Sequence, residues 1–290
     1  MNLHKPSGIT SRQVVDRVTA LLPRVKVGHA GTLDPLASGV LIVCVGAATR
    51  LVECIQRMTK TYHAVILLGA RSDTLDADGR VTAVESPRVP SEQEVQQAVA
   101  GHVGMVAQLP PEFSALRVKG QRAYDLARAG QAVDLKPRLV RIDRAELLAY
   151  RWPRLELEID CGAGTYIRSV ARDVGEALGC GGLIEKLVRT RIGPFELETA
   201  ADPMNLTRET LAEKLHPLLA AVPDLPVFTL SATQAADVTQ GRNLEVASLA
   251  GAAGLEGEIA LLGPDGRLLA VAYADRSQGT IHPRRVFRGG

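Results

Sequence analysis

Near its start the chain carries apolar residues at helical spacing. Val14 and Val18 lie on one face of a predicted amphipathic helix, which ends before Pro23. Thr10 and Gln13 stand three residues apart, immediately before this segment, as in a capping box. The pattern therefore predicts a first helix that begins just after residue 10.

Most of the other apolar segments alternate or form short continuous runs, which is typical of β-strands. We expect strands at residues 40–45, 61–68, 81–84, 139–150 and 155–161, and helices at 91–101, 166–178 and around 206–219. Because these elements do not follow a strict strand–helix–strand alternation, a doubly wound parallel sheet is disfavoured. The predicted fold class is α+β, with a mixed, largely antiparallel sheet and helices packed on it.

The composition changes at Pro223 and Pro226, which predicts a boundary between two domains. Residues 1–222 would form the larger domain, and residues 223–290 a small β-rich one. In the small domain, residues 258–262 and 267–273 flank a Gly-Pro-Asp-Gly turn and predict a hairpin. Within the larger domain, the basic segment near residues 111–137 resembles an exposed arm more than a core element.

Composition and charge exclude several classes of protein. In 290 residues, 46% are apolar and 23% are charged, which predicts a folded chain. The net charge of +2 does not by itself identify a nucleic-acid binder, although basic residues gather in the first 60 positions and the last fifteen. The longest apolar run, residues 40–45, is too short to span a membrane, and no signal peptide is apparent. We expect a cytoplasmic protein that does not bind membranes, and the four scattered cysteines predict neither a metal site nor disulfides.

One glycine-rich segment, residues 28–39, contains a carboxylate, that of Asp34, which is a candidate catalytic group. The chain contains no phosphate-binding loop and no familiar hydrolase motif. Asp34 stands between Leu33 and Pro35, where its carboxylate would be partly shielded from water. Taken alone it can be a turn residue, and beside a cation it can be a nucleophile.

Several motifs, taken together and in this order, resemble the TruB family of tRNA pseudouridine synthases. The segment 28–41, GHAGTLDPLASGVL, is similar to the catalytic loop of that family. The supporting motifs are KPSGITS at 5–11, KTY at 60–62, SDTLDADG at 72–79, PEFSA at 111–115, RAY at 122–124, GTYIRS at 164–169, RTRIGPF at 189–195 and HPRRVF at 282–287. The resemblance is dense over residues 2–200 and weaker in the tail, which is similar to a PUA-type RNA-binding domain.

The resemblance implies an enzyme that isomerises uridine 55 in the T loop of tRNA without cofactor or metal. Asp34 would be the nucleophile, attacking either C1′ of the sugar or C6 of the base. Arg168 would keep the carboxylate ionised through a charge-assisted pair. Tyr62 would stack on the target uracil and is a candidate for removing the C5 proton, whereas its other interpretation is an ordinary strand tyrosine.

Further residues would bind the RNA after the target base has been flipped out of its stack. His29 would fill the space left by the base, unless it is a loop histidine bonded to backbone. Tyr166 and Leu187 match positions that contact the substrate nucleotide, although both can equally serve packing. Basic side chains of the arm would meet phosphates or form a solvated face: Arg117, Lys119, Arg122 and Arg128.

Two other functions fit the same motifs less well. A non-catalytic RNA-binding or RNA-folding module would leave Asp34, Arg168 and Tyr62 without a purpose. A guide-RNA-dependent enzyme is disfavoured because the chain begins almost at its first motif and has no basic extension, so we expect no guide RNA. We also expect a monomer, because the sequence contains no heptad repeat or large apolar stripe that would argue against one. The sequence also departs from the family pattern at Phe113, Arg117 and Ala163, which weakens the prediction of affinity more than that of chemistry.

Overall fold

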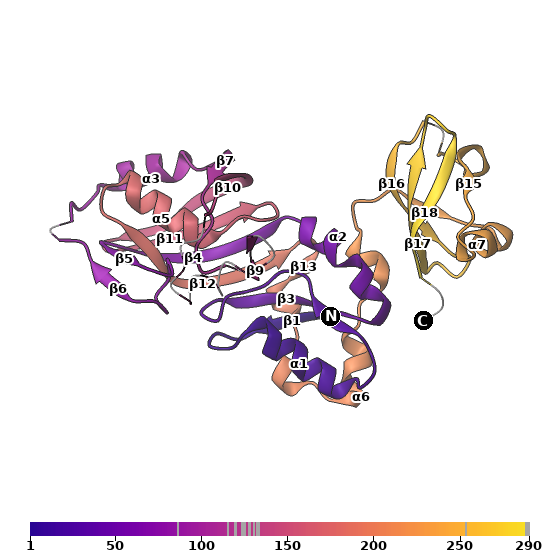
Figure 1. Cartoon of the computed structure of the whole chain (residues 1–290), viewed down its shortest axis with the longest axis horizontal. Helices are drawn as coiled ribbons and strands as arrows, with labels where there is room; N and C mark the ends of the chain where they lie inside the picture. Colours follow the sequence, from indigo (N-terminus) through magenta and orange to yellow (C-terminus); the bar gives the residue numbers. More distant parts are fainter. Residues whose placement is uncertain are drawn as a thin grey trace.

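A nine-stranded mixed sheet forms the centre of the larger part of the molecule (Figure 1). The computed structural model describes residues 1–85, 87–114, 116–118, 121–122, 126, 129, 131, 134–252 and 254–287, without the side chains of 117, 118 and 122. The strands of this sheet are β1 (Asn2–Lys5), β2 (Val27–His29), β3 (Ser38–Val45), β4 (Lys60–Leu68), β7 (Gly104–Gln108), β10 (Arg138–Arg151), β11 (Arg154–Cys161), β12 (Gly182–Ile192) and β13 (Phe195–Glu196).

The strand order is β1-β3-β12-β4-β11-β10-β7, with β2 paired to β3 and β13 paired to β12. Strands β3 and β12 run parallel where Gly39 lies opposite Arg189, and the other pairings in this sheet are antiparallel. This topology confirms the predicted α+β class and the largely antiparallel sheet. It also brings the loop before β3 next to β4 and β12, which come much later in the chain.

Helices pack against both faces of the sheet (Figure 1). Helices α3 (Glu92–Ala100) and α5 (Ile167–Ala177) pack with β4, β10, β11 and β12 around one apolar cluster. Helix α1 (Ser11–Leu21) packs on β1 and β3, and α2 (Val52–Arg57) follows a 3-10 turn, η1 (Gly46–Leu51). The capping boxes predicted at residues 10 and 91 are both present.

Two short hairpins project from the main sheet. Strands β5 (Ala70–Ser72) and β6 (Val81–Ala83) flank a turn whose Ala77 N–H donates to the carbonyl of Ile184 in β12, 2.9 Å away. Strands β8 (Arg117–Val118) and β9 (Gln121–Arg122) form a second hairpin within the predicted arm. The first hairpin confirms the strand predicted after residue 80, and its turn lies against β12.

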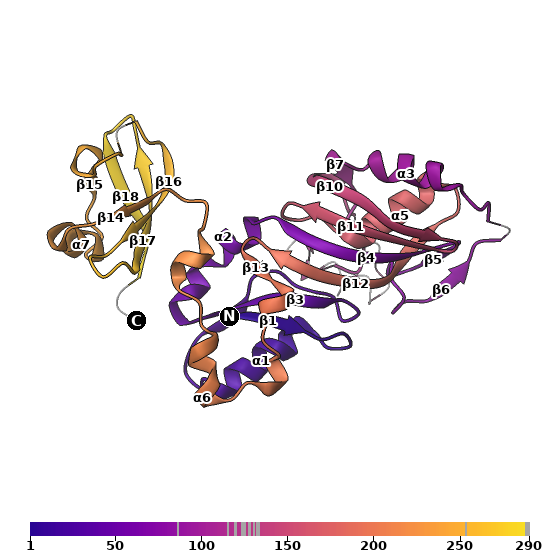
Figure 2. The ribbon, with the colours of Figure 1, turned by 180° about the vertical axis from the view of Figure 1, so that it is seen from behind.

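A separate five-stranded sheet forms the C-terminal part, at one end of the long axis (Figures 1 and 2). It contains β14 (Val227–Thr229), β15 (Leu244–Glu245), β16 (Gly257–Leu262), β17 (Leu268–Asp275) and β18 (Thr280–Val286), with α7 (Ala232–Thr239) packed on it and η6 (Val246–Ser248) beside it. The predicted hairpin at 258–273 is confirmed. Arg57 and Glu258 form an ion pair of 2.8 Å between the two parts, and a shared apolar cluster lies beside it. The domain boundary at 223 stays a prediction.

The helix predicted around residues 206–219 is wrong. The segment contains α6 (Arg208–Leu211) followed by the 3-10 turns η4 (Ala212–Lys214) and η5 (Leu218–Ala221). Pro217 immediately precedes η5 and has no N–H to continue a helical hydrogen-bond ladder. Two further 3-10 turns, η2 (Leu197–Thr199) and η3 (Pro203–Asn205), precede this segment. The glycine-rich segment is also more regular than expected, because its first residues belong to β2.

Candidate active site

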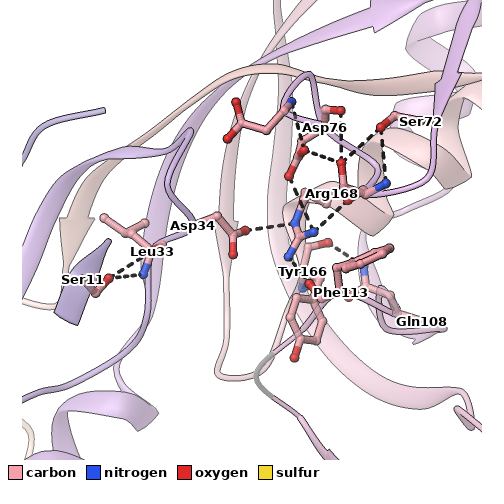
Figure 3. Close-up of polar contacts among 11 residues, drawn as sticks. Ser11, Leu33, Asp34, Ser72, Asp76, Gln108, Phe113, Tyr166 and Arg168 are labelled. Carbon is pink, nitrogen blue, oxygen red and sulfur yellow. Dashed lines mark hydrogen bonds and ion pairs between the residues drawn. The ribbon is translucent and has the colours of Figure 1, made fainter. Parts of the chain in front are cut away.

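The loop between β2 and β3 carries Asp34, and its backbone is hydrogen-bonded to Ser11, the first residue of α1. The Ser11 hydroxyl accepts a hydrogen bond from the Leu33 N–H at 2.8 Å and donates to the Leu33 carbonyl at 3.0 Å (Figure 3). Ser11 is buried, so these two bonds are shielded from water. The backbone of the residue preceding Asp34 is therefore fixed in both directions.

The buried residue Lys5 is hydrogen-bonded to the same loop, at the residue after Asp34. The Nζ atom of Lys5 donates to the carbonyls of Pro6 at 2.9 Å, Ile9 at 2.5 Å and Pro35 at 3.3 Å. Burial lowers the pKa of Lys5 to about 8 from 10.5. Three carbonyls solvate a cation that water cannot reach, and one of them belongs to the residue that follows Asp34.

Arg168 is the centre of the polar contacts around Asp34 (Figure 3). It lies in the first turn of α5 with a side chain that is 6% exposed, whereas the Asp34 side chain is 38% exposed. The Nε atom of Arg168 lies 2.9 Å from Oδ2 of Asp34, an ion-pair distance whose direction does not meet hydrogen-bond geometry. The guanidinium thus holds a carboxylate that solvent, and hence a substrate, can still reach.

The remaining nitrogens of Arg168 are held by main-chain carbonyls from two other segments. Its Nη1 atom donates to the Thr74 carbonyl at 2.7 Å, and its Nη2 atom donates to the Phe113 carbonyl at 2.9 Å. These segments are the turn after β5 and the beginning of the predicted arm. Arg168 therefore joins three parts of the chain that are far apart in sequence at one point.

A second carboxylate, that of Asp76, lies beside the same guanidinium. Its Oδ2 atom is 3.6 Å from Nη1 of Arg168, and its Oδ1 atom accepts hydrogen bonds from Thr74 Oγ1 at 2.5 Å and from the Asp78 N–H at 3.2 Å. Burial raises the pKa of Asp76, against the opposing effect of these donors and of Arg168. Asp76 belongs to the 72–79 motif, but its spacing in the sequence indicates no role for it.

Tyr62 and Leu187 come from the neighbouring strands β4 and β12 and belong to one apolar cluster with Leu33, Ala37 and Ile167. Tyr62 is 8% exposed, and its hydroxyl accepts a hydrogen bond from Nη1 of Arg189 at 3.4 Å. Burial raises the pKa of the Tyr62 phenol, while the charge of Arg189 opposes that effect. The fold thus places the predicted tyrosine and leucine next to the loop that carries Asp34.

Tyr166 lies at the N-cap of α5 and is held by contacts on its backbone and its ring. Its N–H donates to Gln108 Oε1 at 2.8 Å, and its carbonyl accepts from Gln108 Nε2 at 3.1 Å (Figure 3). The guanidinium of Arg138 lies 4.9 Å from the centroid of the ring. These contacts fix the residue two positions before Arg168, whichever role its ring has.

His29 lies in β2, at the entry to the loop, and is half-buried. Its Nδ1 atom is buried and has no hydrogen-bond partner among the described residues. Burial, together with the positive charge of Arg189, lowers the pKa of His29, so that its ring is neutral near pH 7. A backbone interaction with Gly31 raises the pKa of His29 in opposition, so the interpretation of His29 as a loop histidine bonded to backbone stays open beside the predicted role.

The structure describes the beginning of the predicted arm, its hairpin, residues 126, 129 and 131, and its end at 134–137. Arg117 and Arg122 are paired across β8 and β9, while their side chains, and all of Lys119 and Arg128, lie outside the described residues. The predicted phosphate contacts of the arm therefore stay predictions.

Two buried residues that the sequence analysis missed complete the site: Asp76 and Arg189. Asp76 lies in the motif at 72–79 and Arg189 in the motif at 189–195. The motifs indicate that these positions matter, but they do not indicate what the two side chains do. Their importance depends on strand register, because Arg189 reaches Gly31 and Tyr62 only through the pairing of β12 with β3 and β4. Such contacts across more than 100 positions leave no local pattern.

The geometry offers an accessible carboxylate, a buried guanidinium that pairs with it and a shielded phenol nearby. In the described part of the chain, no cluster of three or more His, Cys, Asp or Glu side chains is arranged as a metal site. All four cysteines are buried with free thiols. None of the helices that the structure describes has the length and apolar character of a membrane span.

Two family models match adjoining parts of the chain. The model of the TruB family pseudouridylate synthase N-terminal domain matches residues 19–167, and that of the tRNA pseudouridylate synthase B C-terminal domain matches residues 168–222. The first match includes Asp34 and Tyr62, and the second begins at Arg168. Together they span the larger part of the molecule, from α1 to the boundary predicted at residue 223.

Similar proteins cover the chain almost completely. The tRNA pseudouridine synthase B of Dehalococcoides mccartyi is 38% identical over 99% of this chain and 95% of its own length. The protein of the same name from Thermobifida fusca is 40% identical, over 98% and 97%. A chain in the crystal structure of a Cbf5-Nop10-Gar1 complex aligns with a TM-score of 0.76 at 28% identity, covering 99% of this chain and 84% of that one. The chain belongs to the TruB family of pseudouridylate synthases.

Proposed function

We propose that this protein converts uridine to pseudouridine in tRNA, at position 55 of the T loop, with Asp34 as the nucleophile. The observation that carries the proposal is the pair formed by Asp34 and Arg168, in which an accessible carboxylate faces a buried guanidinium at 2.9 Å. The curated relatives, named tRNA pseudouridine synthase B, support the tRNA substrate. The choice of position 55 rests on the resemblance of the 28–41 loop to the family's catalytic loop.

The reaction is an isomerisation and needs no net oxidation or reduction. The bond between N1 and C1′ breaks, the uracil turns over, and a bond forms between C5 and C1′. The proton leaves C5, and N1 gains one. The Asp34 carboxylate can attack C1′ of the sugar or C6 of the base, and both attacks are compatible with its partial exposure.

Arg168 and Tyr62 would assist this nucleophile in different steps. Arg168 is fixed by the carbonyls of Thr74 and Phe113, so it offers its charge to Asp34 without having to rearrange during the reaction. The Tyr62 phenol is shielded and lies in the same apolar cluster as Leu33. We assign Tyr62 to stacking on the flipped uracil and to removing the C5 proton.

The target base has to leave its stack before it can meet Asp34. We assign His29 to the space that the base vacates, because it lies in β2 at the entry to the loop and burial favours its neutral ring. Tyr166 and Leu187 would contact the extruded nucleotide. Gln108 and Arg138 fix Tyr166 in advance, which reduces the entropy lost when RNA binds.

The other partner assignments follow from the same function. We propose that the protein acts in the cytoplasm as a monomer, on tRNA, without guide RNA. Basic residues of the arm, including Arg117, Lys119 and Arg122, would grip the T stem and loop, and the C-terminal sheet would act as a PUA-like domain near the acceptor end. The relatives named tRNA pseudouridine synthase B support tRNA as the substrate.

An unmodified tRNA transcript incubated with the purified protein alone tests the proposal. Pseudouridine should form at uridine 55 in the absence of any cofactor or second RNA, and a transcript with cytidine at that position should yield none. Nucleoside mass spectrometry, with position mapping by primer extension, gives both results. Tight binding without product would establish the non-catalytic RNA-binding alternative, and product at another uridine would overturn the assigned position.

A further inference from the structure

Arg189 is a buried arginine that connects the loop bearing Asp34 with the phenol of Tyr62. Its side chain donates three hydrogen bonds: Nε to the Val40 carbonyl at 2.8 Å, Nη2 to the Gly31 carbonyl at 3.1 Å, and Nη1 to the Tyr62 hydroxyl at 3.4 Å. The residue is 2% exposed. One guanidinium thus grips both ends of the loop and the hydroxyl beside it.

The charge of this guanidinium is not balanced by a neighbouring acid. Within the described chain, no carboxylate lies within ion-pair distance of Arg189, in contrast to Arg168, which faces two. Burying an unpaired cation is unfavourable, and neutral carbonyls offset only part of the lost hydration. A neutral hydrogen-bond donor could hold the loop with a smaller loss of hydration. The positive charge of Arg189 therefore needs a separate explanation.

The backbone of Arg189 is fixed as firmly as its side chain. Strands β3 and β12 meet in parallel at Gly39 and Arg189, and a Cβ atom at Gly39 would lie 2.1 Å from the Arg189 carbonyl oxygen. The guanidinium therefore starts from a position set by the sheet, and it lies 6.0 Å from the centroid of the Tyr62 ring. Arg189 cannot move far without separating β3 from β12, and it lies opposite Tyr62 in the pairing of β12 with β4.

We propose that Arg189 is a positioning residue for the isomerisation: it holds the loop of Asp34 in register with Tyr62, and its charge stabilises the ionised phenol. The inference rests on the proposed function, because it assigns a purpose to the base role of Tyr62. Positive charge close to a phenol oxygen favours the form that can accept a proton from C5.

The other charged or titratable groups around the pair do not supply the same effect. Tyr62 is faced by Asp34 from the loop and by Cys161 from β11, and ionisation of either would disfavour a phenolate. Arg189 is faced by Lys5, His29 and Lys60, whose protonated forms it disfavours in turn. Of the three groups that act on the Tyr62 phenol, Asp34, Cys161 and Arg189, only Arg189 favours its ionised form.

Fluorine NMR of protein labelled with 3,5-difluorotyrosine measures the ionisation of Tyr62 directly. The fluorines bring phenol ionisation close to neutral pH, and Tyr62→Phe assigns the signal among the five tyrosines. Arg189→Gln should move the Tyr62 midpoint to higher pH by about one unit or more, as expected for removal of a nearby charge. Arg189→Lys should keep the midpoint close to that of the parent.

Single-turnover rates on the tRNA transcript give the second measurement. Arg189→Gln should lower the rate about a hundredfold, with tRNA affinity within a few fold, and the loss should shrink as the pH rises. Arg189→Lys cannot bridge all three acceptors, and its loss should be the same at every pH. The matched control is Arg191→Gln, on the same strand, whose Nε atom bonds Thr61 at 3.1 Å, and it should change neither measurement.

The two measurements separate this inference from the proposed function. An unchanged Tyr62 midpoint in Arg189→Gln, in protein shown to be folded by circular dichroism, would overturn the role of the charge whatever the activity. A rate within twofold of the parent would overturn the positioning role. A parent protein that forms no pseudouridine would instead contradict the proposed function, which the NMR titration does not depend on.

Discussion

The Oδ2 atom of Asp76 lies 3.6 Å from Nη1 of Arg168, so the guanidinium that faces Asp34 also faces a second carboxylate. Asp76 is buried, and the hydrogen bonds from Thr74 and from the Asp78 backbone fix its orientation. Its charge attracts Arg168 from a different segment than Asp34 does. Asp76 thereby helps to set where Arg168 stands when a substrate arrives.

Replacing Asp76 by asparagine should lower kcat about tenfold or more, because the side chain keeps its shape but no longer attracts Arg168. Tenfold corresponds to about 1.4 kcal/mol of lost transition-state stabilisation. tRNA affinity should change by no more than a few fold. Steady-state kinetics and filter binding measure the two quantities, with Asp73→Asn, an exposed neighbour in the same turn, as the control. A kcat within twofold of the parent would show that Asp76 does not position Arg168.

Substitution of Gly39 by alanine should destabilise the protein strongly. Gly39 has φ of +110°, and an added Cβ would clash with the backbone of Arg189. Because the obstacle is backbone, β3 and β12 would have to separate, and we expect a loss of about 2 kcal/mol or more in the free energy of unfolding. Urea denaturation measures the loss. Gly28→Ala, where a Cβ meets nothing within 4 Å, is the matched control, and equal losses at both positions would contradict the close approach.

Two buried lysines predict a rise of stability with pH. Burial lowers the pKa of Lys5 and of Lys60 to about 8 from 10.5. Below pH 8 both lysines are protonated whether the chain is folded or unfolded. Above pH 8 the folded chain loses protons that the unfolded chain keeps, so the free energy of unfolding rises with pH.

The window for this measurement is pH 7.5 to 9. Burial also raises the pKa of Cys44 and Cys161 from 9.0 to about 11, which lowers stability as the pH passes 9. Urea denaturation of the parent and of Lys5→Met across the window isolates the contribution of one lysine. The variant should show a smaller rise, and an equal slope in both proteins would contradict the lowered pKa.

Local signals predicted the local structure well. The capping boxes at Thr10 and Ser91 and the turn at 263–266 are specified by residues within a few positions of each other, and all are present. The helix expected around 206–219 is interrupted at Pro217, although the apolar residues on both sides of it are typical of one continuous element. Element type follows from nearby residues, and breaks follow from single residues that remove a backbone donor.

The site was only partly predictable for a physical reason. Asp34, Tyr62 and Arg168 stand in motifs that resemble a known family, and the fold brings Asp34 into contact with Arg168 and places Tyr62 beside its loop. The contacts of Arg189 and Asp76 depend on the register of β12 against β3 and on a turn that packs on β12. No spacing within the sequence encodes that register.

The most direct test of the central claim is single-turnover conversion of uridine 55 by Asp34→Asn, at enzyme concentrations that saturate binding. The amide keeps the size of the side chain but cannot attack carbon as a carboxylate does, so we expect no detectable pseudouridine while tRNA affinity stays within a few fold of the parent. Pseudouridine formed by Asp34→Asn at a rate close to that of the parent would contradict the assignment of Asp34 as the nucleophile.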